Sequence, residues 1–314
     1  MRIMVTGGAG FIGSHIAEAF VAQGHDVLVV DNLWSQGGGR REFVPQACRF
    51  VHMDIRDEGL ARVFGDFRPE VVCHHAAQHS VAISAREPEH DASVNVLGLL
   101  NVLRNSVRNR VAKVVFASSG ATYGSPERLP IDEDTPQHPL SPYAVTKLAS
   151  EGYLRFFREE HGLDFTALRY ANVYGPRQDP SGEAGVISIF LGKFARGESV
   201  RIDWDGQQTR DYVFVEDVAR ANVCALEAGS GGFYVIGTGV RTSVMQIYDA
   251  LCTTTGRRPP VRFGPRRPGD TRDNEFDASL ARRELGWTPV VGLEEGLRKT
   301  AEFVRTTVLH AQSA

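Results

Sequence analysis

The chain has 314 residues, 42% of them hydrophobic and 23% charged, with 35 basic and 38 acidic side chains. That length supports one large or two modest globular domains, and the ordinary apolar content excludes intrinsic disorder. The net charge of −3 gives no general reason to expect nucleic acid or an anionic membrane as a partner. No segment approaches the ~20 apolar residues of a membrane-spanning helix. The N-terminal residues reach glycine too early for the core of a signal peptide.

The four cysteines lie far apart in the sequence, with neither metal-ligand nor Cys-x-x-Cys spacing. We therefore expect no metal site, and separate reduced thiols in a cytoplasmic protein. These cysteines are Cys48, Cys73, Cys224 and Cys252.

The first half of the chain alternates short apolar runs, typical of buried strands, with longer segments typical of helices. We expect strands at residues 2–6, 26–30, 49–53, 71–75, 113–118 and 164–169, and helices at 14–23, 58–66, 88–109 and 142–161. Strands rich in valine and isoleucine that alternate with helices predict a doubly wound α/β fold with a parallel sheet covered on both faces.

After Tyr170 the composition changes, because Gly, Pro, Asp and Arg cluster in two segments. Residues 213–215, 218–228 and 233–236 are typical of a return to the parallel sheet. We therefore predict a larger domain over residues 1–171, its sheet completed by about 211–237, and a smaller, interleaved C-terminal α/β lobe over 172–210 and 238–314. The other expected elements are helices at 187–196, 244–255, 279–285 and 293–309 and a strand at 199–202.

A glycine-rich loop, residues 7–13, follows the first expected strand and opens a helix. Gly7 allows the tight turn, Gly10 lets the backbone approach a pyrophosphate, and Gly13 lets helix and strand pack closely. The next strand ends at Asp31, about 20 residues further on, as a Rossmann-type dinucleotide site requires. Its carboxylate accepts hydrogen bonds from ribose hydroxyls and repels a 2′-phosphate, which favours NAD over NADP. An ordinary turn is the alternative reading of either feature alone.

Tyr143 and Lys147 lie at the start of an expected helix, where their i, i+4 spacing places them on one face. A neighbouring ammonium favours the phenolate and lowers the pKa of the tyrosine. Ser119, with Ser118 as the fallback, ends the preceding strand, where a hydroxyl can bond a sugar oxygen. An exposed helical pair and a turn-forming serine are the alternatives for each feature taken alone. Their combination with the glycine loop and Asp31 favours a catalytic site.

With these motifs the sequence resembles the extended short-chain dehydrogenases/reductases of the NAD-dependent epimerase/dehydratase family, specifically the UDP-glucose 4-epimerase group. The matching motifs occur in family order over essentially the whole chain. They are residues 6–15, Asp31-Asn32, Ser118-Ser119 ahead of Tyr123-Gly124, Ser141-Pro142-Tyr143 with Lys147, residues 168–177, Arg210-Asp211-Tyr212 and Arg267-Pro268-Gly269-Asp270.

The resemblance implies that Tyr143, as phenolate, takes the proton of the sugar 4-hydroxyl while hydride passes from C4 to NAD. The 4-keto sugar then rotates and takes the hydride back on its other face, a reaction of galactose metabolism. Ser119 bonds the reacting oxygen and Lys147 holds the nicotinamide ribose. The implied cofactor-binding residues are Gly7, Gly10, Phe11, Ile12, Gly13, Asp31, Asn32, Asp54, Ile55, Ala76, Ala77, Gln78, Asn95, Ser118, Tyr143, Lys147 and Tyr170. The implied substrate-binding residues are Ser119, Asn172, Glu183, Val186, Arg210, Arg267 and Asp270.

Similar proteins catalyse other reactions, accept other substrates or have no catalytic role, and the sequence bears on each of these alternatives. Related dehydratases and decarboxylases carry an acidic residue beside the catalytic hydroxyl, whereas Gly120-Ala121 follow Ser119 here. Asn274 aligns with a family position that limits sugar size when it is tyrosine, so a UDP-N-acetylhexosamine is an alternative substrate, as is a UDP-uronic acid. His79 replaces a lysine that many hexose epimerases place near the cofactor phosphates; a loop histidine is the alternative. A non-catalytic dinucleotide-binding sensor is the remaining alternative, which the intact catalytic residues oppose.

The expected helices at residues 88–109 and 142–161 resemble the pair through which this family commonly dimerises as a four-helix bundle. We therefore expect a UDP-sugar as ligand and a second copy of the chain as partner, with no nucleic acid and no membrane.

Overall fold

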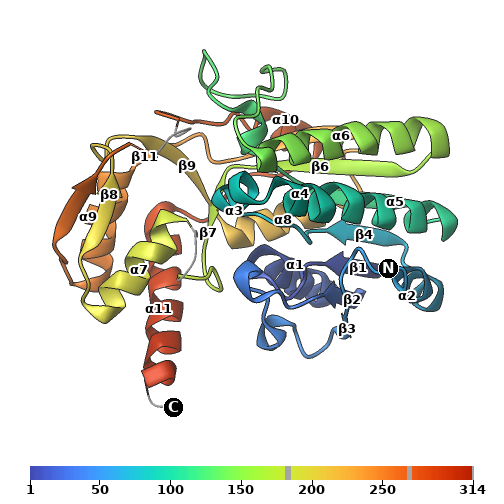
Figure 1. The fold of residues 1–314 in the computed structure, drawn as a ribbon, viewed down its shortest axis with the longest axis horizontal. Helices are drawn as coiled ribbons and strands as arrows, with labels where there is room; N and C mark the ends of the chain where they lie inside the picture. The colour runs from blue at the N-terminus through green and yellow to red at the C-terminus, as the bar shows by residue number, and fades with distance from the viewer. Residues whose placement is uncertain (181–184, 267–270, 313–314) are drawn as a thin grey trace.

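A parallel sheet of seven strands organises the chain, with strand order β10-β6-β5-β4-β1-β2-β3 (Figure 1). The computed structural model describes residues 1–180, 185–266 and 271–312. Every neighbouring pair in this sheet is parallel. The strands are β1 (Arg2–Thr6), β2 (Asp26–Asp31), β3 (Arg49–His52), β4 (Val71–His74), β5 (Lys113–Ser119), β6 (Asp164–Tyr170) and β10 (Gly232–Ile236).

Both faces of the sheet are covered because successive side chains of each strand point to opposite faces. Ile3 and Val5 pack in one buried cluster, while Met4 between them packs in the other. Helices α1 (Phe11–Ala22) and α8 (Val215–Ala225) contribute to the first cluster, and α2 (Leu60–Phe67), α5 (Gly98–Arg108) and α6 (Pro142–His161) to the second. This confirms the doubly wound α/β class expected from the sequence.

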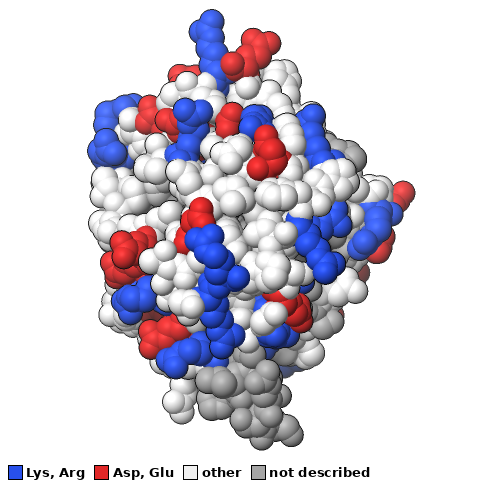
Figure 2. Space-filling view, turned by 90° about the vertical axis from the view of Figure 1, so that its left-hand side faces the viewer, with Lys and Arg blue, Asp and Glu red and all other residues white. Residues whose placement is uncertain are grey.

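The smaller lobe has its own core and two small sheets, and lies on the left in Figure 1. One sheet has the order β11-β9-β7, and the other pairs β12 with β8. Figure 2 looks onto this lobe, where basic and acidic side chains are interspersed. Its elements are β7 (Asn172–Tyr174), α7 (Val186–Arg196), β8 (Val200–Asp203), β9 (Thr209–Phe214), β11 (Arg241–Ser243), α9 (Val244–Thr255), β12 (Val261–Gly264) and α11 (Leu293–Gln312).

The prediction that residues 213–215 return to the large parallel sheet is wrong. Val213 lies in β9 and pairs with Val173 of β7, in the three-stranded sheet of the smaller lobe. By contrast, β10 lies beside β6 at the edge of the large sheet. A short apolar run identifies a buried strand but carries no information about which sheet it joins.

The segment between β4 and β5 differs from the single helix expected over residues 88–109. It contains α4 (Pro88–Ala92), a π-helical turn at Ser93–Leu97, and α5. The sequence analysis missed α3 (Val81–Arg86), whose N-terminus is capped by the Ser80 hydroxyl, 3.1 Å from the Ile83 nitrogen. The remaining elements are α10 (Ser279–Glu284) and 3₁₀ turns at Ser35–Gly37, Arg41–Phe43 and Gly120–Tyr123.

The strand order places a crevice at the carboxyl ends of β1 and β4. The chain runs from β1 outward to β2 and β3, and then returns to β4 on the other side of β1. In open α/β sheets, ligands bind where the order reverses in this way. The glycine loop follows β1, and the other residues expected to bind the cofactor lie at or after the ends of β2, β3, β4, β5 and β6.

Candidate active site

The glycine loop between β1 and α1 has a conformation that only glycine allows. Gly7 has φ +72°, and a Cβ there would lie 2.5 Å from the Ala76 nitrogen at the end of β4. A Cβ on Gly13 would lie 2.2 Å from the Gly7 carbonyl oxygen. Both distances are far inside van der Waals contact, so these glycines let β1, β4 and α1 approach closely.

The first turn of α1 faces the crevice with free backbone donors. Its N-cap is Gly10, which provides no side-chain hydrogen bond, and no acidic residue lies in this turn. Gly10, Phe11 and Ile12 all line the pocket. The first N–H groups of a helix have no intrahelical partner, and they attract an anion. This geometry fits the pyrophosphate of a dinucleotide.

Asp31, the last residue of β2, has its carboxylate oriented by two backbone N–H groups. Its Oδ2 accepts from the Ala9 nitrogen (3.0 Å) and its Oδ1 from the Leu33 nitrogen (2.8 Å). Burial raises the pKa of Asp31, while those two hydrogen bonds oppose the rise. Since each carboxylate oxygen accepts two hydrogen bonds, Asp31 keeps acceptor capacity toward the pocket for ribose hydroxyls.

At the far end of the crevice, Asp54 forms a side-chain network. Its Oδ2 accepts from Asn32 Nδ2 (2.9 Å) and from Arg56 Nη2 (2.8 Å). The Arg56 guanidinium holds the pKa of Asp54 at about 2. Arg56 lines the pocket, and the sequence analysis did not single it out.

One pocket of about 1080 Å³ joins these groups to the smaller lobe. The residues predicted to bind cofactor, substrate or both lie around it with few exceptions. Those that line it are Gly7, Gly10, Phe11, Ile12, Gly13, Asp31, Asn32, Asp54, Ile55, Ala76, Ala77, Ser118, Ser119, Tyr143, Lys147, Tyr170, Asn172, Val186 and Arg210. The predicted substrate residues Glu183, Arg267 and Asp270 lie outside the described residues.

Gln78 and Asn95 were predicted to bind the cofactor, but their side chains lie behind the pocket wall. The Gln78 nitrogen donates to Asn95 Oδ1 (2.9 Å), and Asn95 Nδ2 donates back to the Gln78 carbonyl oxygen (2.9 Å). Both side chains also donate to Asp91 Oδ1, at 2.7 and 3.1 Å. They hold the backbone that lines the pocket and are not among the residues that face it.

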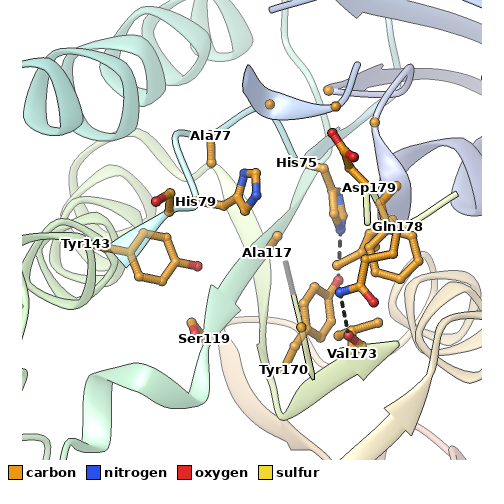
Figure 3. Close-up of a pocket in the computed structure, with 18 of the residues that line it drawn as sticks. His75, Ala77, His79, Ala117, Ser119, Tyr143, Tyr170, Val173, Gln178 and Asp179 are labelled. Atoms are coloured by element: carbon orange, nitrogen blue, oxygen red, sulfur yellow. Dashed lines mark hydrogen bonds between the residues drawn. The ribbon is translucent and has the colours of Figure 1, made fainter. Parts of the chain in front are cut away.

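The predicted catalytic residues converge from α6 and β5. Tyr143 lies in the first turn of α6, which starts at Pro142 after the Ser141 hydroxyl caps the Ala144 nitrogen (3.2 Å). Figure 3 shows Tyr143 pointing into the pocket, with Ser119 at the end of β5 near it and His75 and Tyr170 across from it. The same-face spacing expected from the sequence therefore places the phenol at the pocket.

Lys147 lies one turn further along α6 and is buried. Its Nζ donates to the Ala117 carbonyl oxygen (2.8 Å) and lies 4.9 Å from the centre of the Phe116 ring. Burial lowers the pKa of Lys147 to about 8, although the Asp91 and Glu151 carboxylates oppose this fall.

Without a bound cofactor, Tyr143 is a weaker acid than the sequence analysis expected. Desolvation raises its pKa to about 12, and a hydrogen bond with Ser119 opposes that rise. The Lys147 Nζ lies 5.8 Å from the Tyr143 ring centre and donates to the Ala117 carbonyl oxygen, not to the phenol. Additional positive charge beside the phenol is needed to form the phenolate near neutral pH.

Ser118 and Ser119 have different environments, although both line the pocket. The Ser118 hydroxyl is buried and donates to Glu151 Oε1 (2.6 Å). The Ser119 hydroxyl accepts from the Ala121 nitrogen (3.1 Å) and acts to lower the pKa of Tyr143. The structure thus favours Ser119 over the fallback Ser118 as the hydroxyl beside the base.

Across the pocket lies a buried hydrogen-bonded group that the sequence analysis missed. The Tyr170 hydroxyl accepts from Asn222 Nδ2 (2.8 Å) and lies 2.9 Å from His75 Nε2. Burial lowers the pKa of His75 to about 3, so the imidazole is neutral, and Nε2 and the Tyr170 hydroxyl share one hydrogen bond. The consecutive histidines His74 and His75 after an apolar strand were the available signal.

The smaller lobe contributes polar groups to the far side of the pocket. Arg210 lines it from β9, with Nη1 donating to the Thr209 carbonyl oxygen (2.8 Å). Gln208 donates through Nε2 to the Asp203 carbonyl oxygen (2.9 Å), which leaves its buried Oε1 without a hydrogen bond within the described chain. An orphaned buried acceptor at a pocket wall is a position for a ligand N–H.

A family model describing the NAD-dependent epimerase/dehydratase family matches residues 3–237. The chain belongs to this family. It is 45% identical to a UDP-glucose 4-epimerase of Mycolicibacterium smegmatis, over 97% of this chain and 99% of that one.

Two solved structures are similar over nearly the whole chain. One is a UDP-glucose 4-epimerase with UDP-glucose from Thermotoga maritima, with 48% identity, TM-score 0.95, and coverage of 98% of this chain and 100% of that one. The other is a Thermus thermophilus UDP-glucose 4-epimerase in complex with NAD, with 44% identity, TM-score 0.92, and coverage of 97% and 99%.

In residues 1–180, 185–266 and 271–312, no cluster of three His, Cys, Asp or Glu side chains has the arrangement of a metal site. In the same part of the chain, no helix is long and apolar enough to cross a membrane. The four cysteines are free thiols.

Proposed function

We propose that the chain catalyses the NAD-dependent interconversion of UDP-glucose and UDP-galactose at C4. The observation that carries this proposal is the convergence of three groups on one pocket. These are the glycine loop with Asp31, the Tyr143–Ser119 pair, and the polar wall of the smaller lobe at Arg210. The nearly full-length similarity to UDP-glucose 4-epimerases supports the same reaction.

For the cofactor, the first turn of α1 binds the pyrophosphate and Asp31 accepts hydrogen bonds from the adenosine ribose. Gly7 and Gly13 keep side chains out of this cradle. Lys147 would hold the nicotinamide ribose by donating to its hydroxyls. When bound, NAD supplies a hydride acceptor and a positive charge beside Tyr143 that favours the phenolate.

For the reaction, Tyr143 removes the proton of the sugar 4-hydroxyl as the C4 hydride leaves. Ser119 donates to the same sugar oxygen and keeps it beside the base. After the 4-keto sugar turns over in the pocket, C4 would take the hydride back on its opposite face while Tyr143 returns the proton to the oxygen. The protonation states of the chain's residues would then be the same as at the start. Shielding from water protects the ketone, and the pocket between the two lobes provides it.

We propose the smaller lobe as the nucleotide-sugar site and residues 1–171 as the NAD domain. Arg210 contacts the diphosphate, since a guanidinium donates paired hydrogen bonds that match phosphate oxygens. Gln208 Oε1 accepts a ligand N–H. The family motifs assign Arg267, Asp270 and Glu183 to the same ligand, together with Asn172 and Val186.

The direct test is incubation of purified protein with UDP-galactose, followed by chromatography or NMR of UDP-glucose. Formation of UDP-glucose without net NADH accumulation is the expected result. The variant Tyr143→Phe abolishes turnover but retains bound NAD, whereas Tyr153→Phe on the exposed face of the same helix serves as the matched control. Absence of turnover in wild-type protein that contains bound NAD would refute the substrate assignment. Tyr143→Phe protein with normal turnover would refute the mechanism.

A second proposal concerns larger sugars. Asn274 Nδ2 donates to Asn172 Oδ1 (3.3 Å), so this asparagine borders the pocket wall through Asn172. Asparagine is smaller than tyrosine, which leaves space beside the sugar for an N-acetyl group. Turnover of UDP-N-acetylgalactosamine by the wild type, reduced by Asn274→Tyr, is the expected result. No product from UDP-N-acetylgalactosamine would refute this extension while leaving the C4 reaction intact.

We also propose a homodimer through a four-helix bundle of α5 and α6. Large apolar side chains on this face are exposed in the single chain: Leu97 is 60% exposed, and Val145 and Phe156 are each 51% exposed. Covering such a surface with a second copy removes apolar area from water. Light scattering should give twice the 34.5 kDa mass of the chain. Phe156→Asp should reduce that mass, while Val240→Asp on the other lobe should not; a monomeric wild type would refute the dimer.

A cytoplasmic location remains a prediction that the four free thiols support.

A further inference from the structure

Two carboxylates are buried close to Lys147, on neighbouring helices. Asp91 of α4 has no solvent exposure and Glu151 of α6 is 3% exposed. Neither carboxylate lines the pocket. A buried carboxylate is costly unless a cation or several hydrogen bonds compensate for the lost water. The hydrogen-bond and ion-pair partners of each carboxylate therefore show which cation compensates its buried negative charge.

Glu151 already has its own cation. Its Oε1 accepts from Arg169 Nε (2.9 Å) and its Oε2 from Arg169 Nη2 (2.7 Å), a bidentate ion pair with both side chains buried. The positive charge of Arg169 weakens the field that Glu151 exerts on its neighbours. Glu151 still favours the charged form of Lys147, but less than Asp91 does.

Among the described residues, Asp91 accepts hydrogen bonds only from neutral donors. Its Oδ1 accepts from Gln78 Nε2 (2.7 Å) and Asn95 Nδ2 (3.1 Å), and its Oδ2 from the Thr146 hydroxyl (2.7 Å). These dipoles stabilise the carboxylate but do not cancel its charge. Thr146 is the residue directly before Lys147, so the charge of Asp91 reaches α6 beside the buried ammonium.

Lys147 likewise forms no direct ion pair within the part of the chain that the structure describes. Its Nζ donates to a neutral carbonyl, Ala117 O, and faces the Phe116 ring. The buried region thus contains two anions and two cations, of which Glu151 and Arg169 pair with one another. Asp91 and Lys147 are the charges that remain.

We propose that Asp91 is the buried counter-ion of Lys147, and therefore a positioning residue that keeps the lysine an ammonium beneath the reacting tyrosine. The Asp91 carboxylate favours the charged lysine, and it does so more than Glu151 does. The same charge disfavours the phenolate of Tyr143. Asp91 therefore shifts the ionisation of both groups toward higher pH.

The other groups that face Lys147 do not supply this charge. His74 and His75 at the end of β4 have pKa values lowered to about 3 by burial, so both are neutral at the pH of the reaction. Tyr170 is a neutral phenol because burial raises its pKa. Arg169 is ion-paired with Glu151. Tyr143 itself is neutral until it ionises in the reaction.

The decisive measurement is the ¹⁵N NMR titration of the lysine Nζ atoms. The chain has only four lysines, Lys113, Lys147, Lys193 and Lys299, so the spectrum is simple and Lys147→Arg identifies the relevant signal. Asp91→Asn should move the Lys147 midpoint to lower pH by about one pH unit or more. This reading needs no substrate, so its failure is separate from a failure of the proposed epimerase reaction.

The pH profile of turnover gives a second reading, which rests on the proposed function. Loss of Asp91 should move the acidic limb, set by Tyr143, and the alkaline limb, set by Lys147, in the same acidic direction. The matched control Thr146→Val removes one hydrogen bond to Asp91 and keeps the carboxylate, so it should leave both limbs in place. Lower turnover with unmoved limbs in Asp91→Asn would mean a merely structural role and would overturn the proposal.

A second variant covers the case in which Asp91→Asn does not fold. The double variant Glu151→Gln/Arg169→Met removes the ion pair as a unit and leaves Asp91 in place. Its Lys147 midpoint should stay near the wild-type value. A large fall to lower pH in this variant would assign the counter-charge to Glu151 and overturn the proposal.

Discussion

Replacing Glu151 with glutamine is expected to destabilise the folded chain by about 3–5 kcal/mol. The Glu151–Arg169 pair has side-chain exposures of only 4% and 3%, and its two hydrogen bonds measure 2.9 and 2.7 Å. Glutamine preserves the shape but removes the negative charge, so the Arg169 guanidinium is left buried and unpaired. Ser118 also loses the charged acceptor of its 2.6 Å hydrogen bond. Breaking one side of a buried ion pair is costly mainly because the other charge stays desolvated.

The assay is urea unfolding at neutral pH, followed by circular dichroism, with an exposed ion pair as control. Arg62 and Asp66 pair at i, i+4 on α2 with exposures of 89% and 73%, so Asp66→Asn should cost no more than about 0.5 kcal/mol. The double variant Glu151→Gln/Arg169→Met should be less destabilised than the sum of its single variants by at least about 1 kcal/mol. A loss below about 1 kcal/mol for Glu151→Gln, or additive single effects, would refute the argument from burial.

Two further predictions concern the carboxyl end of the sheet. Gly13→Ala should abolish NAD retention and lower stability, because its Cβ would lie 2.2 Å from the Gly7 carbonyl oxygen; a variant that purifies with normal bound NAD would contradict this. His74 is buried with a pKa of about 3, whereas an unfolded histidine protonates near 6.5, so its contribution to stability is full above pH 6.5 and is lost as pH falls toward 3. The expected loss from His74 is about 1.4 kcal/mol per pH unit. His74→Gln should remove this part of the pH dependence of the unfolding free energy, measured by urea unfolding between pH 7 and pH 4.5, and leave the part that His75 contributes; an unchanged pH dependence would contradict the assignment.

Features that depend on short segments were predictable from the sequence alone. The β1–α1 turn follows from steric limits on a few neighbouring residues, so its glycines identify it directly. Helix α6 runs from Pro142 to His161 as expected, because Ser141 caps its start and Gly162, with φ +67°, ends it. The i, i+4 spacing then fixes Tyr143 and Lys147 on one face. Local rules of this kind need no knowledge of distant parts of the chain.

Features that depend on distant contacts were decided by the tertiary structure. The sheet that β9 joins depends on β7 and β11, which the sequence analysis did not identify as strands. The different environments of Ser118 and Ser119 depend on Glu151 from another helix. Asp91 was not identified as a neighbour of the catalytic pair, since its partners come from the segment after β4, from the turn before α5 and from α6.

The physical reason for this difference between local and long-range features is the distance over which the forces involved act. Backbone sterics, capping and helical spacing act over a few residues, so the sequence by itself determined the elements and the order in which chemical groups follow the strands. Desolvation and charge interactions act through space, and their sign at Tyr143 and Lys147 depends on which buried groups the fold assembles around them. The sequence therefore determined the identity of the reacting groups, and only the tertiary structure decided their ionisation.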